Sequence, residues 1–187
     1  MKKVVILASG SGTLAQAIID ASNEIGIEIL SLISDRSDAY ALTRAEKAGI
    51  ATDIHSITED RITWGRKLLE ILERYQPDLI ISAGFMRILP SEIVNRFKII
   101  NSHPALLPNY PGAHAVRDAL SDKAHITGTT IHWIDEGVDT GEVIAQEEVE
   151  ILPGDTEEIL HERIKIVERR LYVEVLKEIV PTLEKMQ

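Results

Sequence analysis

Short apolar runs rich in Val and Ile alternate with amphipathic segments through residues 1–100. Two of these runs lie at 3–8 and 27–33, and residues 13–24 between them carry apolar side chains at helical spacing. A strand, a helix and another strand in this order form a parallel pair joined by a right-handed crossover. The alternation therefore predicts an α/β fold, with a Rossmann-like domain built on a mostly parallel central sheet.

The same pattern predicts the other elements of this half. Three more strands are expected, at 51–55, 79–83 and 98–100. Three more helices are expected, at 38–48, at 60–75 and from about Ser91. Ligands of open parallel sheets bind where the strands end, so the loops after Ala8, Ala83 and Ile100 are expected to share one cleft.

Beyond residue 100 the periodicity changes. Residues 113–121 have the pattern of a helix, whereas residues 127–134 and 142–150 alternate between polar and apolar side chains. The segment between those two runs is rich in Gly and Asp, which is typical of a tight turn. We therefore expect an antiparallel pair of strands late in the chain.

The last segment, residues 155–180, predicts a long C-terminal helix. Asp155 and Glu158 have the spacing of a capping pair, and Pro181 is expected to stop the helix. No Pro- or Gly-rich linker and no internal repeat divides the chain. A single domain over residues 1–187 is therefore predicted.

The charge balance limits the partners of the chain. Its formal net charge is -10, and nucleic acids and anionic membranes are held mainly by clustered Lys and Arg. The apolar residues 4–8 are too few for a signal peptide, and no run approaches the roughly 20 apolar residues of a membrane span. The lack of cysteine excludes disulfides, thiolate nucleophiles and cysteine-ligated zinc. We expect a cytoplasmic protein that binds neither nucleic acid nor membrane.

The segment 101–112 carries the residues best suited to catalysis. Pro104 favours extended backbone at His103, so the side chains of Asn101 and His103 should emerge from one face of the chain. The asparagine amide is an uncharged hydrogen-bond donor, and the imidazole can carry a proton near neutral pH. Three prolines restrict the loop, which suits a site fixed before its substrate arrives. The sequence leaves Leu107-Pro108 open between cis and trans.

Residues 10–13, Gly-Ser-Gly-Thr, lie between a predicted strand and a predicted helix, where backbone N–H groups can hold a phosphate. The segment also matches the G-x-G-x-x-A dinucleotide pattern through Ala15. Asp35, at the end of the second predicted strand, lies where a ribose-binding acid is expected. An NAD-dependent oxidoreductase is therefore a rival hypothesis, and a tight turn without a ligand is another.

Asp139 lies between Gly137 and Gly141, which allow the backbone to approach another element closely. A carboxylate beside His103 would favour the protonated imidazole and fix its orientation. The alternative is that Asp139 only stabilises a turn, as Asp135 and Glu136 also can.

Other charged and titratable residues have ordinary explanations. Arg87 follows a buried strand and either extends to solvent or clamps a carboxylate. Glu168 is expected on a solvated helix face, and His55 has no evident partner. His125 and His132 are interpreted as surface or packing residues. The histidines lack the close spacing of common metal motifs, so no metal site is predicted.

Several motifs occur together and in a fixed order: the glycine-rich loop 9–12, Gly-Phe-Met-Arg-Ile-Leu at 84–89, the proline-rich segment 101–112 and the turn 135–141. With these motifs the chain resembles the phosphoribosylglycinamide formyltransferase family, which is folate-dependent and belongs to purine synthesis. The resemblance covers nearly the whole chain and makes the dinucleotide hypothesis much weaker.

The resemblance implies a role for individual residues. The catalytic residues would be Asn101, His103 and Asp139. The substrate phosphate and ribose would be bound by Gly10, Ser11, Gly12, Thr13, Leu14 and Glu168. Folate would be bound by Arg61, Met86, Arg87, Ile88, Leu89, Asn101, Asp135, Glu136, Gly137, Val138 and Asp139. Residues 1–100 would then form a phosphate-binding half, and residues 101–187 a catalytic and folate-binding half.

The implied reaction transfers the formyl group of 10-formyltetrahydrofolate to the amine of 5-phosphoribosylglycinamide, without a metal, in a monomer or homodimer. A formyltetrahydrofolate hydrolase and a formyltransferase for another phosphorylated amine are the alternatives within the group. Leu14, Ala105 and Val116 depart from the usual asparagine, serine and more polar residue of the family. These departures bear on substrate affinity more than on the type of reaction.

Overall fold

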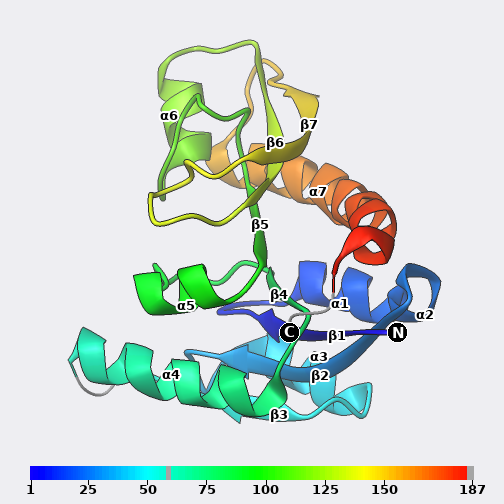
Figure 1. Cartoon of the computed structure of the whole chain (residues 1–187). Coiled ribbons are helices and arrows are strands. Elements are labelled where there is room, and N and C mark those ends of the chain that lie inside the picture. The colour runs from blue at the N-terminus through cyan, green and yellow to red at the C-terminus, as the bar shows by residue number, and fades with distance from the viewer. Residues whose placement is uncertain (58–59, 185–187) are drawn as a thin grey trace.

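The computed structural model of the chain describes residues 1–57 and 60–184, and a seven-stranded sheet runs through it (Figure 1). The strands lie in the order β3-β2-β1-β4-β5-β6-β7. Their bounds are Lys2–Leu7 (β1), Ile27–Ser34 (β2), Thr52–Ile54 (β3), Leu79–Ser82 (β4), Ile99–His103 (β5), Ile126–Trp133 (β6) and Val143–Glu150 (β7). Strands β1 to β5 pair in parallel, and β5–β6 and β6–β7 are antiparallel. The predicted α/β class, the mostly parallel sheet and the late antiparallel pair are confirmed.

Helices flank the sheet close to the predicted places. They are Thr13–Asp20 (α1), Ser22–Ile25 (α2), Tyr40–Lys47 (α3), Arg61–Tyr75 (α4), Ser91–Arg96 (α5), Ala115–Ser121 (α6) and Glu157–Ile179 (α7), with a 3-10 turn at Val180–Thr182 (η1). The single helix predicted at 13–24 is wrong, because Ala21 has φ -91° and ψ 0° and separates α1 from α2. Ile25, the last residue of α2, lies in the core.

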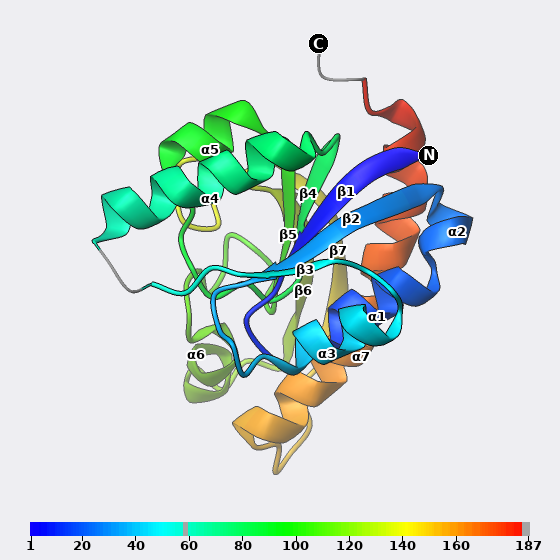
Figure 2. The same ribbon diagram turned by 90° about the horizontal axis from the view of Figure 1, so that it is seen from below.

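Helices cover both faces of the sheet (Figure 2). Val4 and Ile6 of β1 pack with residues of α1, α3 and α7, whereas Val5 and Leu7 pack with residues of α4 and α5. Successive side chains of a strand point to opposite faces, and both faces of a parallel sheet are normally covered. The uninterrupted apolar run of β1 is therefore the sequence signature of a strand buried on both sides.

The beginning of α7 differs from the prediction. Thr156 is the N-cap, and its hydroxyl accepts from the Ile159 N–H at 3.2 Å, so the capping pair of Asp155 and Glu158 is wrong. Asp155 instead accepts two hydrogen bonds from Arg163, at 2.6 and 2.8 Å, which together with the Leu152 N–H lower the pKa of its carboxyl to about 2. The Asp155 carboxylate is occupied by the Arg163 guanidinium, so the neutral hydroxyl of Thr156 caps the helix in its place.

Strand β5 is longer than predicted and contains both Asn101 and His103. In its antiparallel pairing with β6, Asn101 lies opposite His132 and His103 lies opposite Thr130. Asn and His have a low intrinsic tendency to form strands, but a neighbouring strand that supplies hydrogen bonds overrides this tendency. The strand alternation places all four side chains on one face of the sheet.

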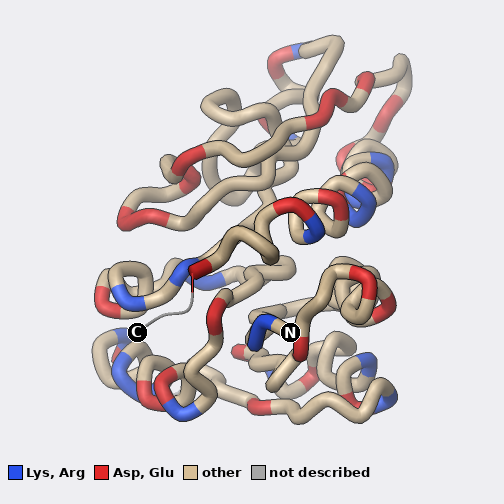
Figure 3. Tube along the Cα trace, turned by 45° about the vertical axis from the view of Figure 1, so that its right-hand side comes forward, with Lys and Arg blue, Asp and Glu red and all other residues tan. Residues whose placement is uncertain are grey.

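The sheet order changes direction between β1 and β4, which both run parallel to their neighbours. The carboxyl ends of the strands at such a reversal are the usual ligand site of an open α/β sheet. Basic and acidic residues are interspersed along the trace (Figure 3). No helix within residues 1–57 and 60–184 is long and apolar enough to cross a bilayer.

Candidate active site

The structure brings Asp139 and His103 together, although 35 residues separate them in the chain. Asp139 Oδ2 lies 3.4 Å from His103 Nδ1, and Asp139 Oδ1 lies 3.8 Å from His132 Nε2. The side chains of His103 and Asp139 are 5% and 14% exposed. A carboxylate with so little solvent around it acts on both imidazoles through a low local dielectric.

The loop 135–141 is shaped to present Asp139. Asp139 has a φ of +55°, and its Oδ2 accepts a 2.8 Å hydrogen bond from the Gly112 N–H at the end of the proline-rich segment. A Cβ atom on Gly141 would lie 1.7 Å from the Trp133 carbonyl oxygen, so only glycine allows the loop to fold back on β6. The predicted close approach at Gly141 is confirmed. The left-handed backbone conformation of Asp139 is costly for a residue other than glycine, and the packing of the loop on β6 holds it.

His103 is fixed at both ring nitrogens. Its Nε2 lies 2.7 Å from the Tyr110 carbonyl oxygen, and its Nδ1 faces Asp139. Both neighbours accept hydrogen bonds, so an imidazolium at this place has an acceptor for each of its protons. The 3.4 Å separation at Nδ1 exceeds an ordinary hydrogen bond, whereas the contact at Nε2 is short.

Hydrogen bonds from the sheet, as well as its own prolines, fix the conformation of the proline-rich segment. Thr130 Oγ1 donates to the Ala105 carbonyl at 2.6 Å and accepts from the Leu107 N–H at 3.0 Å. Gln146 Nε2 donates to the Leu107 carbonyl at 2.8 Å. The Leu107-Pro108 peptide is cis. Residues of β6 and β7 therefore fix the backbone directly after His103.

Of the two interpretations of His132, as a surface or a packing residue, the surface one is wrong, and the buried ring contacts two of the catalytic candidates. It is 2% exposed, its Nδ1 lies 2.9 Å from the Trp133 carbonyl oxygen, and its Nε2 lies 3.3 Å from Asn101 Nδ2. Burial lowers the pKa of the His132 imidazole, so the neutral form is favoured. Neutral His132 that donates from Nδ1 keeps a lone pair on Nε2, which accepts from the Asn101 amide and fixes its orientation.

This arrangement predicts the tautomer of His132. Imidazole ¹⁵N chemical shifts should show the Nδ1–H form, with a titration midpoint below the value of about 6.5 of an unburied histidine. As the pH falls through that midpoint, the imidazolium loses the lone pair that binds Asn101. An Nε2–H tautomer, or a midpoint above 6.5, would contradict the assignment; exposed His125 is the internal reference.

The glycine-rich loop leads directly into α1. Gly12 has a φ of +70°, and no side chain caps the helix. Ser9 precedes the loop, and its hydroxyl donates to Asp35 Oδ1 at 2.6 Å and accepts from the Met86 N–H at 2.8 Å. The loops that follow β1 and β4 are therefore in direct contact, as expected for neighbouring strand ends.

Asp35 has a different partner from the one expected of a dinucleotide-binding acid. Its Oδ2 accepts from Arg87 Nε at 2.6 Å, and its other oxygen is used by Ser9. The Asp35 side chain is 1% exposed. Because both oxygens are bound by protein donors in a buried place, the geometry argues against a ribose hydroxyl at Asp35.

Arg87 clamps a carboxylate of the protein itself, and its side chain is still 42% exposed. Its neighbours Met86 and Ile88 are exposed, whereas Leu89 lies in the core. Arg61 Nη2, at the start of α4, donates to the Ile88 carbonyl at 3.2 Å. The predicted folate-binding residues of α4 and the 86–89 segment therefore lie together.

The acids of the 135–141 loop differ in their surroundings. Asp135 Oδ1 accepts from the Gly137 N–H and the Thr140 hydroxyl, as a turn acid does. Glu136 accepts from Asn95 of α5, and Val138 is half exposed. These residues line the same loop as Asp139 but do not share its histidine partners.

The expectation that Glu168 lies on a solvated helix face is wrong. The Ser102 hydroxyl donates to Glu168 at 2.6 Å, from the strand position between Asn101 and His103. Burial raises the pKa of the Glu168 carboxyl, and the hydrogen bond from Ser102 opposes that rise. Helix α7 is thereby tied to the strand that carries the catalytic candidates.

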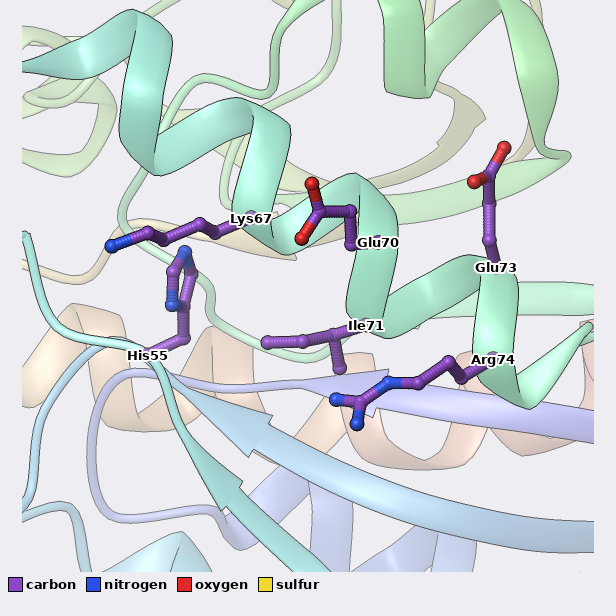
Figure 4. Close-up of a pocket in the computed structure, with 6 residues that line it drawn as sticks. All are labelled: His55, Lys67, Glu70, Ile71, Glu73 and Arg74. Atoms are coloured by element: carbon purple, nitrogen blue, oxygen red, sulfur yellow. The ribbon is translucent and has the colours of Figure 1, made fainter.

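A separate surface hollow lies beside α4 (Figure 4). It is lined by His55, Lys67, Glu70, Ile71, Glu73 and Arg74. None of the predicted site residues lines it. His55 has a partner after all, because its Nε2 lies 2.8 Å from the Trp64 carbonyl oxygen and its ring stacks on Trp64. Among the residues that the structure describes, no group of three His, Cys, Asp or Glu could hold a metal ion.

Comparison with known proteins identifies the family of the chain. Residues 2–176 match the model of the formyl transferase family. A phosphoribosylglycinamide formyltransferase of Mycobacterium tuberculosis is 41% identical over 175 residues, which cover 91% of this chain and 81% of that protein. One of Escherichia coli is 39% identical and covers 90% and 82%. The crystal structure of a phosphoribosylglycinamide formyltransferase from Bacillus halodurans superposes with a TM-score of 0.92 at 36% identity and covers 100% of both chains.

Proposed function

The chain belongs to the formyl transferase family and formylates phosphoribosylglycinamide with 10-formyltetrahydrofolate as the formyl donor, and we propose that Asn101, His103 and Asp139 catalyse a direct transfer. The observation that supports this site most is the contact of Asp139 with His103 at the end of β5, on the same face as Asn101. The arrangement brings a carboxylate to the sheet face that carries two hydrogen-bond donors.

The first step is attack of the glycinamide amine on the formyl carbon. A carbon–nitrogen bond forms, and the carbonyl electrons move to oxygen to give a tetrahedral oxyanion. The Asn101 amide, oriented by His132, is one donor for that oxyanion. The Nδ1 proton of His103 is the other, because its 3.4 Å separation from Asp139 is too long for an ordinary hydrogen bond and leaves the proton able to turn to the oxyanion. Tyr110 keeps the ring in place through Nε2. Each such donor contributes a few kcal/mol, or about 100- to 1,000-fold in rate.

The second step breaks the bond between the formyl carbon and the folate nitrogen. The amine loses a proton, and the departing nitrogen gains one. Asp139 is the group for this transfer, directly or through a water, because it is the carboxylate beside His103. The same carboxylate lies 3.4 Å from Nδ1 of His103, the donor proposed for the oxyanion.

The substrates bind on either side of these groups. The phosphate lies on the backbone of Gly10, Ser11, Gly12, Thr13 and Leu14, at the start of α1. Glu168 binds the ribose from α7. Folate lies along the 86–89 segment and the 135–139 loop, with Arg87 near its glutamate tail and Arg61 close to the ligands. Residues 1–187 form one domain, with a phosphate-binding half at 1–100 and a catalytic and folate-binding half at 101–187.

We further propose that the protein is cytoplasmic, is a monomer or a homodimer, and binds neither nucleic acid nor membrane. The net charge of -10 supports the lack of nucleic acid and anionic membrane partners, because these polyanions repel an acidic protein.

The deciding experiment mixes the protein, 10-formyltetrahydrofolate and phosphoribosylglycinamide and follows deformylation of the folate by absorbance. Stoichiometric loss of the formyl group that requires the amine is the expected result. Loss without the amine would identify a hydrolase, and turnover only with another phosphorylated amine would identify a different acceptor. No change under any of these conditions would refute the function.

A further inference from the structure

Helix α3 contacts the glycine-rich loop at two successive peptide groups. The Ala41 N–H donates to the Gly10 carbonyl at 3.1 Å, and Arg44 Nε donates to the Ser11 carbonyl at 2.8 Å. A Cβ on Gly12 would lie 2.6 Å from the Cα and Cβ atoms of Ala41, so the helix packs on the loop as closely as glycine permits.

These contacts fix the direction of the loop amides. In a trans peptide the C=O and the following N–H point in opposite directions. A Gly10 carbonyl and a Ser11 carbonyl turned toward α3 therefore turn the N–H groups of Ser11 and Gly12 away from it. Within the part of the chain that the structure describes, neither N–H donates a hydrogen bond. Two aligned, unsatisfied donors ahead of the start of α1 have the arrangement that anions bind.

Arg44 is itself held in place for this contact. Its Nη1 lies 3.3 Å from Gln16 Oε1 in α1, and its guanidinium lies 5.0 Å from the centre of the Tyr40 ring. The side chain is only partly exposed. A guanidinium bound at two sites and stacked on an aromatic ring loses little further freedom when the substrate arrives.

From these contacts we propose that Arg44 is a positioning residue for the substrate phosphate. It turns the Ser11–Gly12 peptide so that the Gly12 N–H faces the phosphate, and its positive charge adds to the attraction. The inference rests on the proposed function, because the phosphate that it concerns is that of phosphoribosylglycinamide. Arg44 acts through the backbone and does not touch the reacting atoms.

Lys47 provides a matched control. It lies on the same helix, carries the same charge and lies 6.0 Å from the same Tyr40 ring, and no hydrogen bond joins it to the described loop residues. Arg44→Met is expected to raise the KM for phosphoribosylglycinamide by at least about tenfold, as loss of a charged hydrogen bond does. Lys47→Met is expected to change it less than about twofold. Arg44→Lys, which keeps the charge but not the planar Nε donor, should resemble Arg44→Met.

Further readouts separate positioning from a general structural role. The KM for 10-formyltetrahydrofolate and kcat should stay within about twofold in Arg44→Met, and ribose 5-phosphate, as a competitive inhibitor, should lose affinity in parallel with the substrate. Equal effects of Arg44→Met and Lys47→Met, or equal rises in both KM values, would overturn the inference. The failure of the proposed function is distinguishable, since it would show as no turnover in the unaltered protein.

Discussion

His103→Ala should lower kcat by about 100- to 1,000-fold, because the variant loses one of the two donors for the oxyanion. The loss is expected in kcat more than in the KM of either substrate, since the oxyanion exists only after the attack. Steady-state rates of folate deformylation, measured with both substrates saturating, test this prediction. His125→Ala makes the same chemical change at an exposed position and should keep full activity.

The imidazole of His103 is buried, so its removal also affects stability. The Tyr110 carbonyl and the Asp139 carboxylate each lose a partner, which costs about 1–3 kcal/mol for each polar group left unsatisfied. A variant that remains folded by circular dichroism and binds the folate, but retains more than about a tenth of the unaltered kcat, would contradict the assigned role. His103→Leu fills part of the buried volume without a donor and serves if the alanine variant does not fold.

Asp139→Asn should lower kcat by about 100- to 10,000-fold, the range of a group that transfers a proton in the rate-limiting step. The amide keeps the size of the carboxylate and can still accept from the Gly112 N–H, so the loop should keep its shape. It cannot take a proton at neutral pH, so it cannot carry the proton from the amine to the folate nitrogen. The measurement is kcat as a function of pH, together with dissociation constants for both substrates.

The dissociation constants should change less than about tenfold, because Asp139 acts mainly in the transition state. Asp20→Asn, an exposed carboxylate at the end of α1, is the control for the loss of one negative charge. Unchanged turnover in Asp139→Asn would show that the aspartate only stabilises its turn. The proton would then have to reach the folate nitrogen by another route.

Much of the fold was predictable because its signals are local. An uninterrupted apolar run such as that of β1 indicates a strand buried on both faces, and helical spacing in the next segment supplies the crossover. The predictions failed where local signals compete. Ala21 interrupts a helical pattern that continues on both sides of it, and two neighbouring residues, Asp155 and Thr156, could each have capped α7.

The candidate site was predictable to the extent that it lies in one stretch of chain. Asn101 and His103 are two residues apart, so strand alternation alone places their side chains on one face. The glycine-rich loop is likewise a local pattern between a strand and a helix. Such arguments apply only to residues that lie on the same strand, helix or turn.

Tertiary structure decided the rest. The register of β5 against β6 places His132 opposite Asn101, and nothing in either segment alone specifies that register. Packing between elements brings Arg44 to the Ser11 carbonyl and Glu168 to Ser102. By itself the sequence determined most of the strands and helices and the chemical character of the site. Which distant side chains meet depended on the packing of the whole sheet, because the energy of such contacts arises only when separate elements are brought together.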